Sequence, residues 1–140
     1  MSESFVAKNY MARSLTTFTP GMDIYEAAGL LLENRISGAP VIDAKGKLVG
    51  LLSEQDCLKV IMTTGMYNLP PGTVADYMTK ENIVTITPDL SIFELAEMFM
   101  KYKFRRFPVV EHGRLVGQVS KRDLLSAIKD MRKGVKKIKK

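Results

Sequence analysis

The sequence predicts an α+β fold made of two copies of one β-α-β-β-α unit. Three observations predict it: an internal repeat, a Thr-Pro pair at the same place in each copy, and apolar residues at helical spacing after each pair. A chain of 140 residues is long enough to bury a core. Its 46% hydrophobic and 26% charged residues argue against a disordered chain.

The two copies align over a little more than 50 residues. Tyr10-Met11-Ala12-Arg13 corresponds to Tyr77-Met78-Thr79-Lys80, and 48–53 corresponds to 115–120. We therefore place the first repeat at 10–62 and the second at 74–128. Residues 63–73, which contain Pro-Pro-Gly, are the expected linker. An N-terminal segment (1–9) and a basic tail (129–140) flank the repeats.

Each copy begins with an extended stretch that ends at the Thr-Pro pair, because a residue before proline avoids the helical region. A helix follows, with Asp23 and Glu26, or Ser91 and Glu94, at the spacing of a capping box. The apolar face of each helix has residues at i, i+3, i+4, i+7 and i+8. These residues are Ile24, Ala27, Ala28, Leu31 and Leu32 in the first copy, and Ile92, Leu95, Ala96, Phe99 and Met100 in the second.

Two strands joined by a Gly-containing turn come next, at 40–43 and 48–52 in the first copy and at 108–111 and 115–119 in the second. A last helix begins at Ser53 or Ser120. One such unit has a three-stranded sheet with a bare face. We therefore expect each copy to need its twin.

The repeated pattern of Pro40-Val41-Ile42-Asp43 and Ser53-x-x-Asp56 resembles a tandem pair of CBS domains, the Bateman module. The resemblance runs from about Lys8 to about Ile128. It implies two units packed about a pseudo-twofold axis, sheets with helices on one side, and a homodimer. It also implies a regulatory module that binds an adenine nucleotide (AMP, ADP or ATP) in the cleft between the repeats. Some members of the family bind S-adenosylmethionine, NADH or cyclic dinucleotides instead.

The Ser-x-x-Asp motifs lie where a strand ends and a helix begins, at Ser53 and Asp56 and again at Ser120 and Asp123. A helix N-terminus favours a phosphate, and a carboxylate can accept two hydrogen bonds from vicinal ribose hydroxyls. The resemblance implies these two roles for the serine and the aspartate. The alternative is that the serine is an N-cap and the aspartate a favourable acid in the first helical turn.

The resemblance also implies that the segment before each first strand walls the base and approaches the phosphates. In the first copy this segment is Gly38, Ala39 and Pro40, and in the second it is Arg105, Arg106, Phe107 and Pro108. The arginines suit a phosphate, although they also suit a solvated helix end. Thr79 is expected to meet the adenosine at the second site, whereas the first copy has Ala12 at that position.

The remaining features predict no reaction. The chain has one His and one Cys, too few for a zinc site, and it carries no Gly-rich phosphate loop and no nucleophile elbow. We therefore expect no catalytic residues, no metal and no required cofactor. His112 is expected in an exposed turn, and Cys57 is expected on a helix, either packed or partly exposed.

The sequence shows no signal peptide and no apolar run long enough for a membrane span, and its single cysteine fits a reducing compartment, so we expect a cytoplasmic protein. The predicted dimer contacts are Leu58, Ile61, Leu125 and Ile128. We expect the signal to pass to a client protein that the sequence does not identify, or to act through the dimer. One alternative is a scaffold without a small ligand. The net charge of +6 comes from the last ten residues, so another alternative is nucleic-acid binding through the tail residues Arg132, Lys133, Lys136, Lys137, Lys139 and Lys140.

Overall fold

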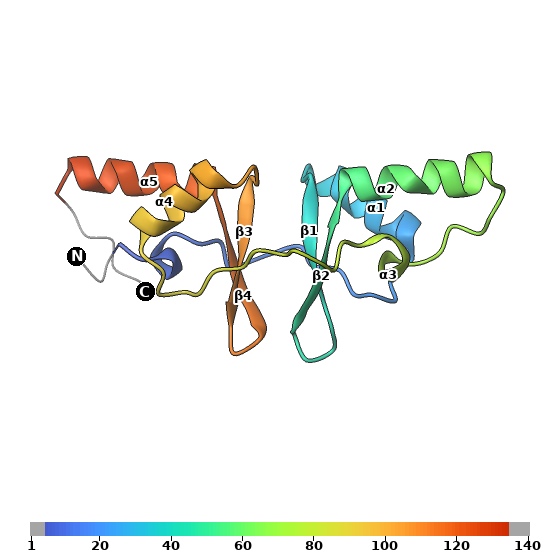
Figure 1. Cartoon of the computed structure of the whole chain (residues 1–140), viewed down its shortest axis with the longest axis horizontal. Helices are drawn as coiled ribbons and strands as arrows, with labels where there is room; N and C mark the ends of the chain where they lie inside the picture. The colour runs from blue at the N-terminus through green and yellow to red at the C-terminus, as the bar shows by residue number, and fades with distance from the viewer. Residues whose placement is uncertain (1–4, 135–140) are drawn as a thin grey trace. The chain divides into compact units, whose positions relative to one another are not determined.

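The structure is a computed structural model that describes residues 5–134 (Figure 1). The chain divides into two compact units. The first unit is Thr16–Ile83, and the second unit combines Met1–Leu15 with Val84–Lys140. Each unit contains helices and one small antiparallel sheet, so the predicted α+β fold of two repeated units is confirmed. The tail residues Lys136, Lys137, Lys139 and Lys140 lie outside the described residues.

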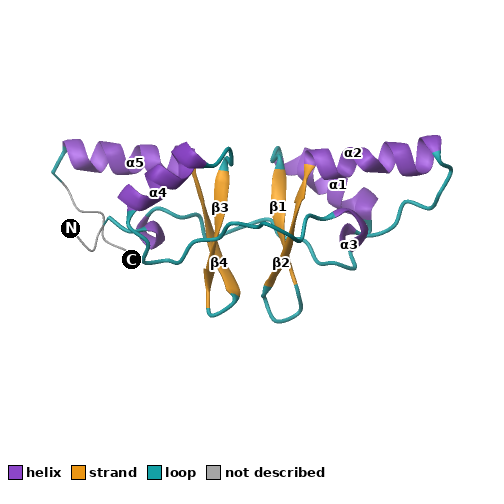
Figure 2. Cartoon of the chain, viewed as in Figure 1, coloured by secondary structure: helices purple, strands orange, loops and turns teal. Residues whose placement is uncertain are grey.

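The first unit is built on the hairpin of β1 (Gly38–Ile42) and β2 (Leu48–Ser53). Its helices are α1 (Ile24–Asn34), α2 (Glu54–Val60) and the short α3 (Val74–Tyr77). A π-helical turn, η2 (Ile61–Met66), extends α2 into the expected linker. Both long helices lie on the same side of the hairpin (Figure 2).

The second unit repeats this arrangement with β3 (Arg106–Glu111) and β4 (Arg114–Ser120). Its helices are α4 (Ile92–Lys101) and α5 (Lys121–Arg132), with a 3-10 turn, η1 (Ala7–Asn9), from the N-terminal segment. Here too the two long helices share one side of the sheet (Figure 2).

The expected first strand of each repeat is reduced to one bridged residue. Phe18 forms a parallel bridge with Val41, and Ile86 forms the same bridge with Val109. The Phe18 N–H donates to the Pro40 carbonyl at 3.0 Å. The Thr-Pro pair follows at once, and proline has no N–H with which to continue a ladder. The expected third strand is therefore a single bridge beside the first strand of each two-stranded ladder.

A second chain segment crosses each sheet at a glycine. Thr79 pairs with Leu51 of β2 through two hydrogen bonds of 2.8 and 2.9 Å, and Ala12 pairs with Gln118 of β4 through bonds of 2.8 and 3.0 Å. A Cβ on Gly50 would lie 2.7 Å from the Met78 sulfur and 3.0 Å from the Thr79 carbonyl oxygen. Only a glycine lets the crossing backbone come this close.

The counterpart of Gly50 is Gly117, where a Cβ would lie 2.6 Å from the Met11 sulfur and 2.9 Å from the Ala12 carbonyl oxygen. The segment around Ala12, at the start of the first repeat, therefore packs against a strand of the second repeat. The segment around Thr79, at the start of the second repeat, packs against a strand of the first.

Each unit has its own apolar core between the helices and the sheet. In the first unit the core joins α1, both strands and α3, and its buried residues are Phe18, Ile24, Ala27, Leu31, Ala39, Val41, Leu52, Val74 and Tyr77. In the second unit the corresponding cluster is Ala7, Ile86, Leu95, Phe99, Phe107, Val109 and Val119. A smaller cluster of Tyr10, Ile92 and Ala127 attaches the N-terminal segment to α4 and α5.

The predicted apolar helix faces are confirmed except at their last position. Leu32 and Met100, the i+8 residues, are 81% and 86% exposed, so this end of each apolar face lies outside the core. A residue at i+8 lies about 80° around the helix from residue i. Both residues fall in the last turn of their helices. The last residue that each helix buries in the core is the i+7 residue, Leu31 or Phe99.

We predict that Gly50→Ala lowers the free energy of unfolding by about 1–3 kcal/mol, the usual cost of overpacking, because the added methyl group meets a backbone carbonyl. Chemical denaturation followed by circular dichroism measures this. The matched control is Gly29→Ala. Gly29 is exposed in the middle of α1, and a Cβ added there would meet no atom within 4 Å. That change should stabilise the helix by about 1 kcal/mol. Equal stability of the two variants would contradict the crossing geometry.

Candidate functional site

Each Ser-x-x-Asp motif forms a reciprocal capping box at the start of the last helix of its repeat. The Asp56 N–H donates to Ser53 Oγ at 3.1 Å, and the Ser53 N–H donates to Asp56 Oδ2 at 2.9 Å. The same two bonds join Ser120 and Asp123, at 3.1 and 2.8 Å. The N-cap role is therefore present in both copies, and it fixes the position of each carboxylate.

The cap engages one oxygen of each aspartate and leaves the other for further contacts. Asp56 is only 7% exposed, and its Oδ1 lies 3.5 Å from Thr79 Oγ1 and 3.9 Å from Lys59 Nζ. Both contacts are longer than a normal hydrogen bond, which is about 2.7–3.2 Å. Each serine hydroxyl accepts in the cap and keeps its own proton to donate. Each motif thus offers one hydroxyl donor and one carboxylate acceptor.

Thr79 lies with the motif of the first repeat, which corrects its expected place at the second site. Its hydroxyl is 3.5 Å from both carboxylate oxygens of Asp56. The crossing over β2 brings it there, and Ala12 takes the equivalent place beside β4. The first unit therefore holds Gly38, Ser53, Asp56 and Thr79 together. The sequence gives no local signal for this arrangement, because the contact joins residues 23 positions apart.

The residues before β1 and β3 differ between the units. A Cβ on Gly38 would lie 3.0 Å from the Leu52 carbonyl oxygen. The close pairing of β1 with β2 therefore accounts for this glycine without a ligand. Arg106 holds the equivalent register position opposite Ser120, and its exposed neighbour Arg105 accepts a backbone bond from Lys121 at 3.2 Å. The arginines therefore lie beside the second capping box.

Four other residues predicted for the site are buried in their strands: Ala39, Pro40, Phe107 and Pro108. Phe107 packs its ring 4.6 Å from that of Phe99 in the core of the second unit. These four residues position the backbone at the start of each strand. Their contact with a ligand stays a prediction.

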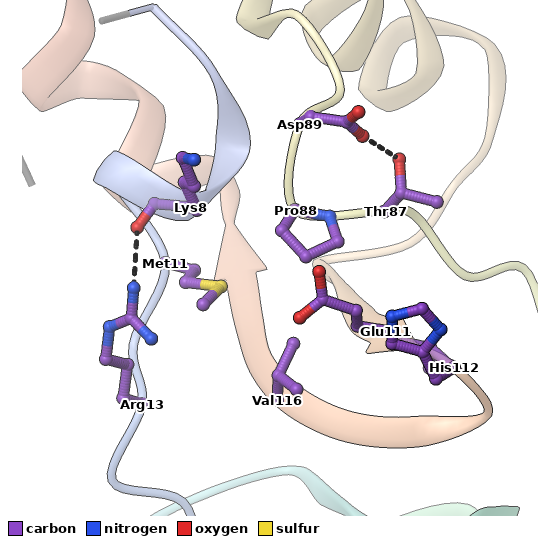
Figure 3. A pocket seen from close by; sticks show the side chains of 10 residues that line it. Lys8, Met11, Arg13, Thr87, Pro88, Asp89, Glu111, His112 and Val116 are labelled. Carbon is purple, nitrogen blue, oxygen red and sulfur yellow. Dashed lines mark hydrogen bonds between the residues drawn. The ribbon is translucent and has the colours of Figure 1, made fainter.

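The second unit also contains a hollow of about 540 Å³ at the other end of its sheet, beside the β3–β4 turn (Figure 3). Lys8 and Arg13 come from the segment before the first repeat's helices, Glu111 ends β3, and His112 lies in the turn. The Arg13 guanidinium is held by the Lys8 carbonyl at 3.4 Å, and the Thr87 hydroxyl donates to Asp89 at 2.8 Å. Its lining includes none of the residues predicted to bind a nucleotide, and the sequence did not indicate it.

Two further observations concern reaction chemistry. Within residues 5–134, no three His, Cys, Asp or Glu residues are grouped so as to hold a metal ion. Burial, together with the charges of Asp56 and Glu54, raises the pKa of the Cys57 thiol. A nucleophilic cysteine needs the opposite shift.

In the described part of the chain, no helix has the length and apolar character needed to cross a membrane. The cytoplasmic location stays a prediction.

Comparison with known proteins identifies the repeats. The family model "CBS domain" matches residues 7–63 and 74–130. The chain is 34% identical over 110 residues to inosine-5'-monophosphate dehydrogenase of Aquifex aeolicus, an alignment that covers 78% of this chain and spans only 21% of that enzyme.

Two solved structures share the fold along nearly their whole length. The first is CBSX2 of Arabidopsis thaliana in complex with AMP, with a TM-score of 0.79, 25% identity, and coverage of 91% of this chain and 98% of that one. The second is the CBS domain pair of protein MJ0100 in complex with 5′-methylthioadenosine and S-adenosyl-L-methionine. It has a TM-score of 0.71, 28% identity, and coverage of 90% and 97%.

We predict that Ser53→Ala and Ser120→Ala each lower the free energy of unfolding by about 1 kcal/mol, because each removes the acceptor for an N–H at a helix start. Thermal and urea denaturation measure the change. Ser126→Ala, on the exposed middle of α5, is the matched control and should be neutral or slightly stabilising. A loss at Ser126 as large as the other two would show that the caps are not the cause.

Proposed function

Because this chain belongs to the CBS domain family, we propose that it is a regulatory module that binds an adenosine-containing ligand and signals to a partner protein without a reaction of its own. The observation that carries the proposal is the doubled capping box. In both copies the serine hydroxyl and one carboxylate oxygen remain available at a helix start. Vicinal ribose hydroxyls and a phosphate are the groups that such an arrangement recognises.

The relatives support the adenosine part of this ligand. CBSX2 is complexed with AMP, and the MJ0100 domain pair with 5′-methylthioadenosine and S-adenosyl-L-methionine. These three molecules share adenosine and differ in charge at its 5′ end. We propose an adenine nucleotide of the AMP, ADP or ATP class, because Arg105 and Arg106 adjoin the second capping box and a guanidinium favours phosphate.

In the first unit, Thr79 strengthens the proposed site. Its exposed hydroxyl lies against the carboxylate of Asp56, where it can donate to the same oxygen or to a ligand. Gly38 begins the paired strand opposite Ser53. The residues that bind in the first unit are then Gly38, Ser53, Asp56 and Thr79, and those in the second unit are Arg105, Arg106, Ser120 and Asp123.

We predict that AMP, ADP or ATP raises the melting temperature, and that the double change Asp56→Asn with Asp123→Asn weakens binding about tenfold or more, since a hydrogen bond to a charged acceptor is lost. At 100 times its dissociation constant a ligand adds about 2.7 kcal/mol of stability. Calorimetric titration measures the affinity, with S-adenosylmethionine and NADH in the same panel. Asparagine keeps the carbonyl oxygen that caps the helix, so the fold is retained.

The matched control is Asp23→Asn, the same change at the N-cap of α1, where the side chain accepts from the Glu26 N–H. It should leave the affinity unchanged. An affinity unaffected by the Asp56 and Asp123 changes would refute the site. A panel without any response would favour the alternative, a scaffold without a small ligand.

We also propose a homodimer that forms through the outward faces of α2, η2 and α5. Four large apolar side chains are 57–66% exposed there, which is unusual for two helices: Leu58, Ile61, Leu125 and Ile128.

We predict that sedimentation gives twice the chain mass of 15.7 kDa. Ile61→Glu with Ile128→Glu should give the monomer. Leu32→Glu with Met100→Glu, at the more exposed positions of α1 and α4, should not give the monomer. A monomeric parent protein would overturn this proposal.

A further inference from the structure

A cationic patch lies at one end of the second unit. It comprises Lys101, Lys103, Arg105, Arg106, Lys121 and Arg122. Five of these residues are exposed, and Arg106 is half-buried. The end of α4, the start of β3 and the start of α5 meet at this end of the sheet, opposite the β3–β4 turn (Figure 1). The Lys121 N–H donates to the Arg105 carbonyl at 3.2 Å, which joins the two stretches that carry the patch.

The internal repeat shows that the fold does not require these charges. Residues 101–106 and 120–123 hold six Lys or Arg and one Asp, a formal charge of +5. The equivalent residues of the first unit, 33–38 and 53–56, hold one Arg, two Glu and one Asp, a formal charge of −2. The first 130 residues are formally neutral as a whole, but they contain this local excess of positive charge. The two copies therefore differ by seven charges at this end.

Aromatic rings lie among the cations. Tyr102 and Phe104 stack with their ring centroids 5.7 Å apart and their planes 15° from parallel, and the Lys101 ammonium lies 5.4 Å from the Tyr102 centroid. Phe104 is 42% exposed and also packs edge-on against the buried Phe107 at 5.9 Å. The first unit has Asn34 and Ile36 in place of Tyr102 and Phe104. The stack is thus anchored to the core on one side and open on the other.

We propose that this end of the second unit binds single-stranded nucleic acid. Clustered Lys and Arg neutralise successive phosphates, and an exposed aromatic ring offers a surface on which an unpaired base can stack. A duplex hides the faces of its bases, so the aromatic stack favours a single strand. Free adenine nucleotides have too few phosphates to use all six cations. The patch is also separate from the basic tail at the C-terminus.

The test uses the full chain and a labelled oligouridine of roughly twelve nucleotides, with fluorescence anisotropy measured at several salt concentrations. Lys101→Glu with Lys103→Glu should weaken binding about tenfold or more and flatten the salt dependence. Phe104→Leu keeps an apolar side chain against Phe107 and should weaken binding several-fold through lost stacking. These three residues are outside the proposed nucleotide site, so the thermal shift with AMP should be retained.

The matched control is Lys45→Glu with Lys47→Glu, the same charge change on the exposed turn of the first unit. It should bind the oligonucleotide as the parent protein does, and so should a chain that ends at Gly134. Absence of binding, loss of binding only on removal of the tail, or an unaffected Phe104→Leu variant would each overturn the proposal. So would equal competition by duplex or by polyglutamate of matched charge, since either would show a general polyanion site.

Discussion

The close crossing of a backbone segment over each sheet is the contact on which the rest of the structure depends. At Gly50 and Gly117 the missing side chain lets the crossing segment exchange two hydrogen bonds with the neighbouring residue of the strand. The crossing segment belongs, in sequence, to the stretch before the other repeat. One repeat alone would lack the segment that covers its own strands, so the duplication is a requirement of this topology. The same crossing carries Thr79 to the carboxylate of Asp56.

Sequence reasoning succeeded where the signals are local. The helix N-caps and the Ser-x-x-Asp boxes depend on residues within four positions of one another, and the structure contains them, although Ser91 accepts from the Phe93 N–H in place of the expected Glu94. It failed where the outcome depends on tertiary contacts. Periodicity could not show that the core ends before Leu32, and alignment of the copies could not show which unit Thr79 joins. Both outcomes depend on where a distant backbone packs.

The two units show which features the backbone requires and which are free to differ. Both keep the crossing glycine, the capping box and the bridged residue before the Thr-Pro pair. They differ where β1 and β3 begin, with Arg105 and Arg106 in place of Ser37 and Gly38. Both units form the same pair of strands with either set of residues, so this difference is available for binding. A module with two identical scaffolds can therefore present two chemically distinct surfaces.

The capping box also offers a route from the proposed site to the proposed interface. Asp56 is fixed by the first turn of α2, and the exposed Leu58 and Ile61 follow on α2 and its continuation. A ligand that binds the free oxygen of Asp56 changes the charge and the hydrogen bonding at the start of this helix, where the dipole is most sensitive to charge. Binding at Asp56 alters the dimer interface only if the ligand has different affinities for two conformations of this helix, as any regulatory coupling requires. The same geometry recurs at Asp123 and α5, so both helices that present an apolar face begin at a proposed ligand contact.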